Sequence, residues 1–177
     1  PKGGFAYKVI PLYSNGTKDF TGEIKLSYKK FSQTAKYHSL TLSVDARQYL
    51  YDYNKEYTRI MPQLNIEFKK PSLRSKIYKY LNASYVHLVK EEETLGFINA
   101  QFGYANNRTI NPFSAYSSIE KGYNYSKIQL GGFFRKIINQ KKQLNIRGYI
   151  GYVNTEDNIY NLKMSAWNGS DDYMFTE

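Results

Sequence analysis

The chain has 177 residues, the length of one ordinary domain, and with 41% hydrophobic residues and a mean hydropathy of −0.63 its composition is not that of a disordered protein. Its 25 Lys and Arg outnumber its 15 Asp and Glu and give a net charge of +10, which suits either nucleic-acid phosphates or the phosphates of lipid headgroups. The absence of cysteine excludes disulfides and thiolate metal sites. No apolar run reaches roughly 18 residues, which excludes a transmembrane helix.

Apolar and polar residues alternate along most of the chain, which is the pattern of a β-strand with one apolar and one polar face. Between residues 60 and 68, for example, Leu64 and Ile66 lie on one face, and Gln63 and Glu67 lie on the other. The pattern predicts eight strands, near residues 20–31, 37–49, 57–69, 76–90, 94–105, 123–136, 143–153 and 159–168. A ninth candidate lies around residues 5–13.

Two segments are harder to interpret. In 76–90, Ile77, Leu81 and Leu88 also fit the spacing of a helix, although we favour a strand. Residues 106–122 are expected to form a long loop. Outer-membrane barrels carry their longer loops on the extracellular side, so we expect this loop to be extracellular and the connections at Lys90–Glu93 and Ile137–Lys142 to be periplasmic.

Alternation alone does not separate a membrane barrel from a soluble sandwich of two sheets. The predicted strands run roughly ten to fourteen residues, which matches the ~9 to 11 that cross a bilayer better than the ~5 to 6 of soluble strands. Tyrosines at predicted strand ends, Tyr49, Tyr51 and Tyr53 in one group and Tyr123 and Tyr125 in another, suit an interfacial girdle. We therefore expect an all-β, antiparallel, up-and-down transmembrane β-barrel. Residues 1–177 would be one barrel of about eight strands, or an arc of a larger barrel truncated at both ends.

The alternation assigns one set of side chains to lipid and another to a polar lumen. The predicted lipid-facing residues are Ile24, Leu26, Leu40, Leu42, Val44, Ile60, Leu64, Ile66, Phe68, Ile98, Phe102, Ile128, Leu130, Phe134, Leu144, Ile146, Ile150, Leu162 and Met164. The predicted lumen-facing residues are Lys25, Asp45, Arg47, Arg59, Gln63, Glu67, Gln101, Lys127, Gln129, Arg135, Arg147 and Lys163. The lumen cations either set an anion preference in a pore or pair with the carboxylates Glu23, Asp45 and Glu67 in a filled interior.

Several segments of the chain carry a resemblance to known proteins. They are Tyr57–Leu64, Phe68–Pro71, Asn106–Pro112, Leu144–Gly151 and Asp171–Phe175. Over about residues 55–175 the chain resembles the barrel region of large outer-membrane proteins of Bacteroidota, in some of which the barrel accompanies a region similar to family M1 metallopeptidases. The resemblance implies an integral outer-membrane component, as part of a multi-protein assembly. It does not imply catalysis, because zinc peptidases of that type need two His one helical turn apart with a Glu between them. His38 and His87 form no such motif.

The remaining candidate sites have ordinary structural explanations. His38 and His87 have no nearby carboxylate partner in sequence, and we interpret them as ordinary strand residues. The run Glu91–Glu93 offers oxygen ligands for a hard cation but is more typical of a solvated turn. Gly131–Gly132, in the middle of a predicted strand, would relieve crowding or bend the wall. We expect no catalytic residue, no cofactor and no metal in this segment.

The sequence thus favours a structural, anchoring or complex-scaffolding barrel in the bacterial outer membrane. Its expected partners are membrane lipid, lipopolysaccharide and other outer-membrane proteins. Nucleic acid is not expected, because the excess cations lie between the predicted strands, as at Lys69 and Lys70. The alternatives are a small-solute pore and a soluble β-sandwich that binds glycans through exposed tyrosines.

Overall fold

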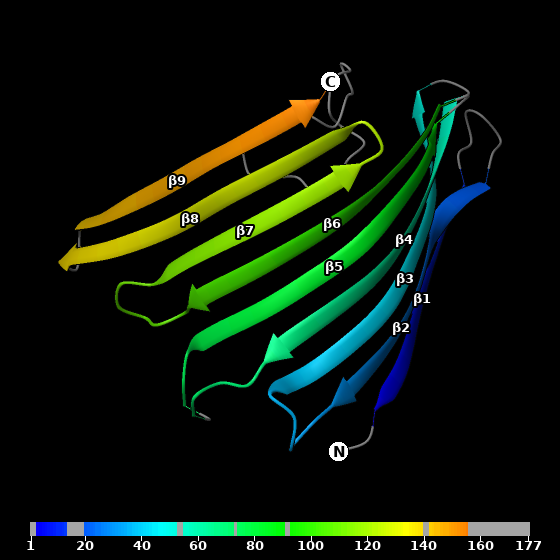
Figure 1. Ribbon diagram of the computed structural model, residues 1–177. Coiled ribbons are helices and arrows are strands. Elements are labelled where there is room, and N and C mark those ends of the chain that lie inside the picture. The colour runs from blue at the N-terminus through cyan, green and yellow to red at the C-terminus, as the bar shows by residue number, and fades with distance from the viewer. Residues whose placement is uncertain are drawn as a thin grey trace.

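Nine antiparallel strands form one sheet in the computed structural model, which describes residues 3–13, 20–52, 55–72, 74–90, 93–139 and 142–155. The strands are β1 (Gly4–Tyr13), β2 (Phe20–Phe31), β3 (Tyr37–Asp52), β4 (Lys55–Phe68), β5 (Ile77–Lys90), β6 (Glu93–Asn106), β7 (Phe113–Gly122), β8 (Tyr125–Asn139) and β9 (Lys142–Thr155). Each strand pairs with its neighbours in sequence, so the order across the sheet runs from β1 to β9 (Figure 1). Among the described residues, no helix is long and apolar enough to cross a membrane.

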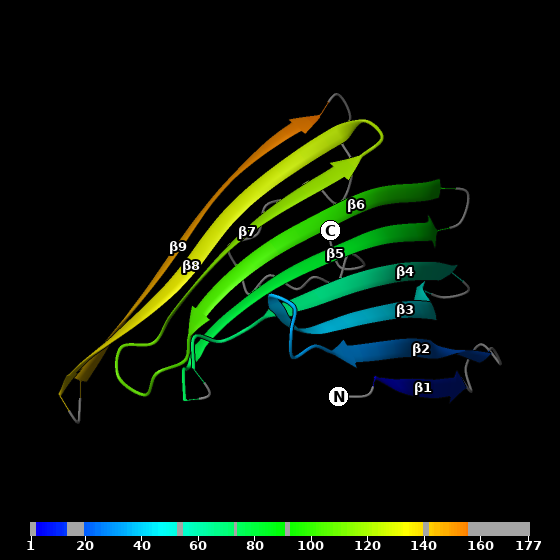
Figure 2. The same cartoon turned by 60° about the horizontal axis from the view of Figure 1, so that its bottom comes forward.

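The sheet is curved, and its strands sweep round as an arc from β1 to β9 (Figure 2). Pairing extends along nearly whole strands: β5 pairs with β6 from Ile77 opposite Asn106 to Lys90 opposite Glu93. Within the described residues no pairing joins β1 to β9, so these two strands are the edges of an open sheet. The all-β, antiparallel, up-and-down arrangement predicted from the sequence is confirmed.

Cross-strand neighbours explain why the alternating segments adopt this register. Leu42 on β3 lies opposite Leu64 on β4, and Leu64 lies opposite Ala83 on β5. One residue along each strand, Ser43 lies opposite Gln63. Because side chains on a strand alternate between faces, a slip of one residue would exchange the apolar and polar sets, so the register is strongly specified.

Most predicted strands coincide with observed ones. The prediction of 20–31 matches β2, and the candidate around 5–13 is β1. Segment 76–90 is the strand β5 and not a helix. The predicted strand 159–168 lies outside the described residues.

The predicted long loop over 106–122 is wrong, because most of it is strand β7, Phe113–Gly122. The apolar side of this strand carries two serine-sized residues, Ala115 and Ser117, and ends in Lys121, so the contrast between its faces is weak. Pairing with β6 along its whole length, and with β8 along most of it, makes it a strand all the same. Tertiary pairing outweighs a weak local pattern here.

The missed strand also changes the predicted placement of the connections. With β7 counted, the connection at Lys90–Glu93 and the one at Ile137–Lys142 lie at opposite ends of the sheet, not at the same end. One end, which we call the loop end, carries connections of five, eight, six and two residues. The other, the turn end, carries one connection of six residues and three of two residues.

Candidate functional site

The two faces of the sheet differ sharply, and together they form the candidate site. We call the face that carries Leu42 and Leu64 the apolar face, and the face that carries Ser43 and Gln63 the polar face. The register places on the apolar face all the residues predicted to face lipid, apart from Leu162 and Met164, which lie outside the described residues. It places on the polar face all those predicted to face a lumen, apart from Lys163, which also lies outside them.

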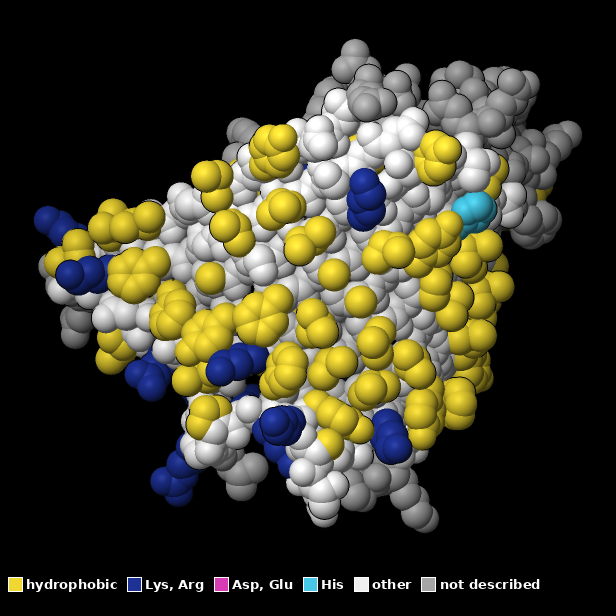
Figure 3. Space-filling model, viewed as in Figure 1, with side chains coloured by type: hydrophobic (Ala, Val, Ile, Leu, Met, Phe, Trp, Pro, Cys, Tyr) yellow, Lys and Arg dark blue, Asp and Glu magenta, His cyan; other side chains and the backbone are white. Residues whose placement is uncertain are grey.

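The apolar face is exposed across the sheet. Ile98 on β6 is 58% exposed and Leu130 on β8 is 51% exposed, although both strands have a neighbour on each side. Ile150 on the edge strand β9 is 67% exposed. Figure 3 shows hydrophobic side chains spread over this face, with no acidic side chain in view. A soluble monomer rarely exposes so large an apolar surface, and such a surface marks contact with a membrane or another protein.

Aromatic rings and lysines gather near the loop end of the apolar face. Phe68 and Phe102 lie 6.5 Å apart between ring centroids, and Tyr104 and Phe113 lie 5.6 Å apart. The Lys79 ammonium sits 5.5 Å from the centre of the Tyr104 ring. Rings and cations at one level of a sheet are the arrangement found where hydrocarbon meets lipid headgroups.

Of the tyrosines predicted to form a girdle, Tyr125 is wrongly assigned, and the rest of the girdle stays a prediction. Tyr123 is 95% exposed in the connection between β7 and β8. Tyr125 instead lies buried on the polar face, where its hydroxyl donates a 2.8 Å hydrogen bond to Oε1 of Glu120. The parity of the strand turns it inward, so it is not part of a girdle. The side chains of Tyr49, Tyr51 and Tyr53 lie outside what the structure describes.

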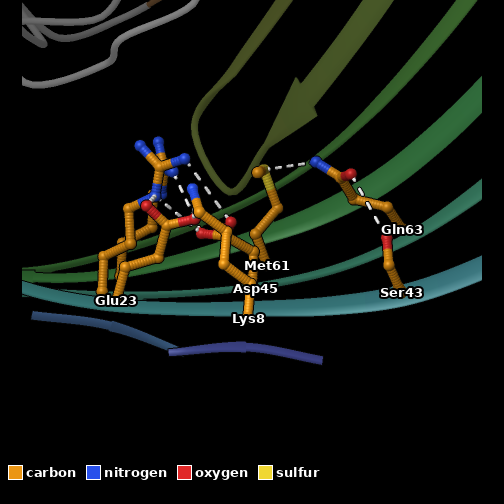
Figure 4. Close-up of polar contacts among 8 residues, drawn as sticks. Lys8, Glu23, Ser43, Asp45, Met61 and Gln63 are labelled. Atoms are coloured by element: carbon orange, nitrogen blue, oxygen red, sulfur yellow. Dashed lines mark hydrogen bonds and ion pairs between the residues drawn. The ribbon is translucent and has the colours of Figure 1, made fainter. Parts of the chain in front are cut away.

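A network of ion pairs crosses four strands on the concave, polar side of the sheet (Figure 4). Asp45 Oδ1 lies 2.9 Å from Arg47 Nε and 3.2 Å from Arg59 Nη2. Glu23 lies 3.6 Å from Arg47 Nε and 3.3 Å from Lys8 Nζ. Asp45 and Arg59 are 1% and 3% exposed, so each must have an opposite charge close by. Of the two interpretations left open for the lumen cations, pairing is the one observed for Arg47 and Arg59.

The polar face also holds an apolar cluster that the sequence did not reveal. Val86 and Phe97 are buried there, with Tyr125 packed against Phe97 at 6.3 Å between ring centroids and Met61 alongside. Their register explains this, because Val86 and Phe97 are opposite each other on β5 and β6. The cluster lies toward the turn end, so the polar face is mixed there.

Two rows of residues cross the polar face nearer the loop end. The first follows the register through Glu67, Tyr80, Gly103, Tyr116, Gly131 and Tyr149, from β4 to β9. The second, two residues along each strand, runs through Thr41, Asn65, Asn82, Gln101, Ser118 and Gln129, from β3 to β8. We call them the tyrosine row and the amide row.

Tyrosine rings in the first row lie over glycines of the next strand. A Cβ placed on Gly103 would come 2.0 Å from the Tyr80 ring, and one on Gly131 would come 2.4 Å from the Tyr116 ring. No real Cβ fits at such distances. Gly131 therefore relieves crowding, one of the two roles expected for it.

Gly103→Ala is expected to lower the free energy of unfolding by ~1 to 3 kcal/mol, the usual cost of forcing extra volume into a packed site. The Tyr80 ring would have to leave its place above the strand. Gly148→Ala is the control, because a Cβ there would meet nothing within 4 Å. Urea unfolding of the folded protein measures both. Equal losses in the free energy of unfolding for the two variants would show that the Tyr80 ring does not need a glycine at position 103.

The other candidate residues take part in ordinary contacts. His87 stacks on Tyr85 with ring centroids 6.5 Å apart, and His38 meets the edge of Phe31 at 5.8 Å. Arg135 Nε donates a 3.0 Å hydrogen bond to Asn145 Oδ1. Among the described residues, no three His, Asp or Glu gather as a metal site. Glu91 and Glu92 lie outside these residues.

Comparison of the chain with protein-family models, with curated proteins and with solved structures gave no match.

Proposed function

We propose that this chain forms part of the wall of a transmembrane β-barrel in the bacterial outer membrane, with a structural, anchoring or scaffolding role and no chemistry of its own. One observation carries the proposal: nine strands of 10 to 16 residues share an apolar face that is exposed across the sheet. Strands of ~9 to 11 residues suffice to cross a bilayer at a tilt.

The two edges of the sheet support the same proposal. Edge strand β1 exposes Phe5 at 87% and Tyr7 at 81%, and edge strand β9 exposes Ile150 and Tyr152 at 67% and 66%. Long apolar edges with free backbone groups are a hazard in water, and in lipid every backbone group needs a partner. A barrel that adds strands beyond β1 and β9 would satisfy both edges, which favours an arc of a larger barrel over a soluble module.

The connection lengths give the proposed orientation. Outer-membrane barrels have short periplasmic turns and longer extracellular loops, so the loop end would face outward. Three lysines on the apolar face near this end would then lie level with the phosphates of lipopolysaccharide: Lys30, Lys79 and Lys136. Other outer-membrane proteins remain proposed partners.

Cysteine labelling on intact cells tests the insertion and its direction. The chain has no native cysteine, so Thr109→Cys at the loop end and Tyr123→Cys at the turn end each introduce a single thiol. A membrane-impermeant maleimide should label the first in intact cells and the second only after the outer membrane is permeabilised. A membrane barrel would be rejected in favour of a soluble module by two results together. The maleimide would label both thiols or neither thiol in intact cells, and osmotic shock would release the protein without detergent.

The pore alternative receives little support from the ion pairs. Arg47 and Arg59 are bound to Asp45, so they are not free to attract anions. Conductance of the full-length protein in planar bilayers separates the two functions, since a scaffold with a filled interior would be silent.

A further inference from the structure

The tyrosine row and the amide row together suit one kind of ligand. We propose that this part of the polar face binds an uncharged oligosaccharide, with tyrosine rings stacking on sugar faces and amides bonding sugar hydroxyls. The inference rests on the proposed function in that this wall would line the interior of the barrel, which is then open to water at the two rows and filled near the ion pairs toward the turn end.

The rings keep part of their surface exposed. Tyr80 and Tyr116 lie over Gly103 and Gly131, and both are only half-buried. The Tyr80 ring also packs against the Tyr78 ring, with centroids 5.6 Å apart. Tyr149 continues the row on β9 and is half-buried as well. These three tyrosines occupy alternate strands, which sets them ~9 to 10 Å apart at the usual strand spacing. The result is a ladder of flat aromatic surfaces, and aromatic side chains of this kind offer a large apolar face together with a polar hydroxyl.

The amide row supplies donors and acceptors beside those rings. Asn65, Asn82, Gln101 and Gln129 each carry both an NH₂ group and a carbonyl oxygen, which matches a hydroxyl group that donates and accepts. The two rows are separated by two residues along each strand, ~7 Å, so a ligand lying on the rings reaches the amides.

One atom of the amide row lacks a partner. Oδ1 of Asn82 is buried and accepts no hydrogen bond among the described residues. A buried carbonyl oxygen left without a hydrogen bond is unfavourable, so a donor is expected at this position. A sugar hydroxyl supplies such a donor.

The charges on the polar face indicate that the ligand is neutral. In the two rows Glu67 is the only charged residue, and its two carboxylate oxygens accept hydrogen bonds from Ser39 at 2.8 Å and Tyr78 at 3.0 Å. Lys29, which lies opposite Thr41 at the end of the amide row, pairs with Glu67 at 3.9 Å. The ion pairs of Asp45, Arg47 and Arg59 lie toward the turn end, away from both rows. The charges of Glu67 and Lys29 are paired with each other, so neither offers a charged glycan an unpaired counter-charge.

Binding of maltohexaose, cellohexaose and mannohexaose to the full-length protein in detergent, measured by calorimetry, tests the inference. At least one should bind, and polygalacturonate should not bind better. Tyr116→Leu and Gln101→Leu should each weaken that binding by roughly tenfold or more. Tyr116→Phe keeps the ring and should retain it.

A matched control lies on the opposite face. Tyr85 also covers a glycine, because a Cβ on Gly96 would come 2.8 Å from its hydroxyl, but it faces the apolar side. Tyr85→Leu should therefore leave sugar binding unchanged while disturbing the sheet in a similar way. Equal losses in Tyr85→Leu and Tyr116→Leu would overturn the inference.

Other outcomes also overturn it and leave the barrel intact. A protein that inserts and labels as proposed yet binds none of the three oligosaccharides has no sugar site on this wall. If an unstructured polar peptide binds to the wall instead of sugar, and Tyr116→Leu weakens that binding, the occupant of the wall is a polypeptide.

Discussion

Asp45→Asn is expected to lower the free energy of unfolding by about 3 to 5 kcal/mol, the cost of leaving a buried charge without its partner. Arg59 is 3% exposed and its Nη2 lies 3.2 Å from the Asp45 carboxylate. An asparagine of the same shape keeps the packing but removes the charge. Urea unfolding of the full-length protein folded in lipid vesicles measures the loss.

Two further variants show whether the loss comes from the stranded arginine. Lys8→Met removes a cation that is 56% exposed at 3.3 Å from Glu23, and such exposed pairs contribute roughly 0 to 1 kcal/mol. Asp45→Asn combined with Arg59→Met should recover most of the stability, since the buried charge is then gone as well. Suppose that Lys8→Met lowers the free energy of unfolding as much as Asp45→Asn does, or that the losses of the two single variants add up in the double variant. Burial of the ion pair is then not the cause of the loss.

Leu64→Arg is expected to cost ~2 to 4 kcal/mol, because an arginine would then face the middle of the hydrocarbon layer. Leu64 lies on the apolar face of β4, four residues before the end of the strand, between Leu42 and Ala83. The same unfolding measurement in vesicles, together with the yield of inserted protein, records the effect.

The neighbouring position provides the control. Gln63 belongs to the same strand but points to the polar side with Ser43 (Figure 4). Gln63→Arg should therefore cost far less than Leu64→Arg. Comparable effects at both positions would mean that the apolar face does not meet lipid.

Local alternation was enough to predict most strands and the face that each residue occupies. Leu42, Ile98 and Leu130 stay on one exposed face and do not converge in a two-layer core. The pattern works because neighbouring strands share it, so that pairing and burial agree with the local signal. Where one strand lacks contrast, as in β7, the neighbours decide and the sequence alone misleads.

Features that depend on register could not be predicted in the same way. Tyr116 and Gly131 are ordinary residues until β7 and β8 are aligned, and then the ring lies over the glycine. The pairing of Asp45 with Arg59 likewise depends on how β3 and β4 are aligned, and the sequence alone does not fix that alignment. Tyr125 differs from these two features, because it shares the parity of Lys127 and Gln129 in the same strand and the alternation alone places it on the polar face. Knowing which residue faces which across a strand pair would have revealed the other two.

The meander topology also has a consequence for how the chain reaches this structure. Among the described residues, the backbone of every strand hydrogen-bonds only to the strands before and after it, so each strand pairing belongs to a single hairpin. Contacts of short sequence separation form with little loss of loop entropy and favour fast folding. Assembly can therefore proceed as a zipper, in which each finished hairpin is the template for the next strand, and removal of an outer hairpin leaves the alignment of the remaining ones unchanged.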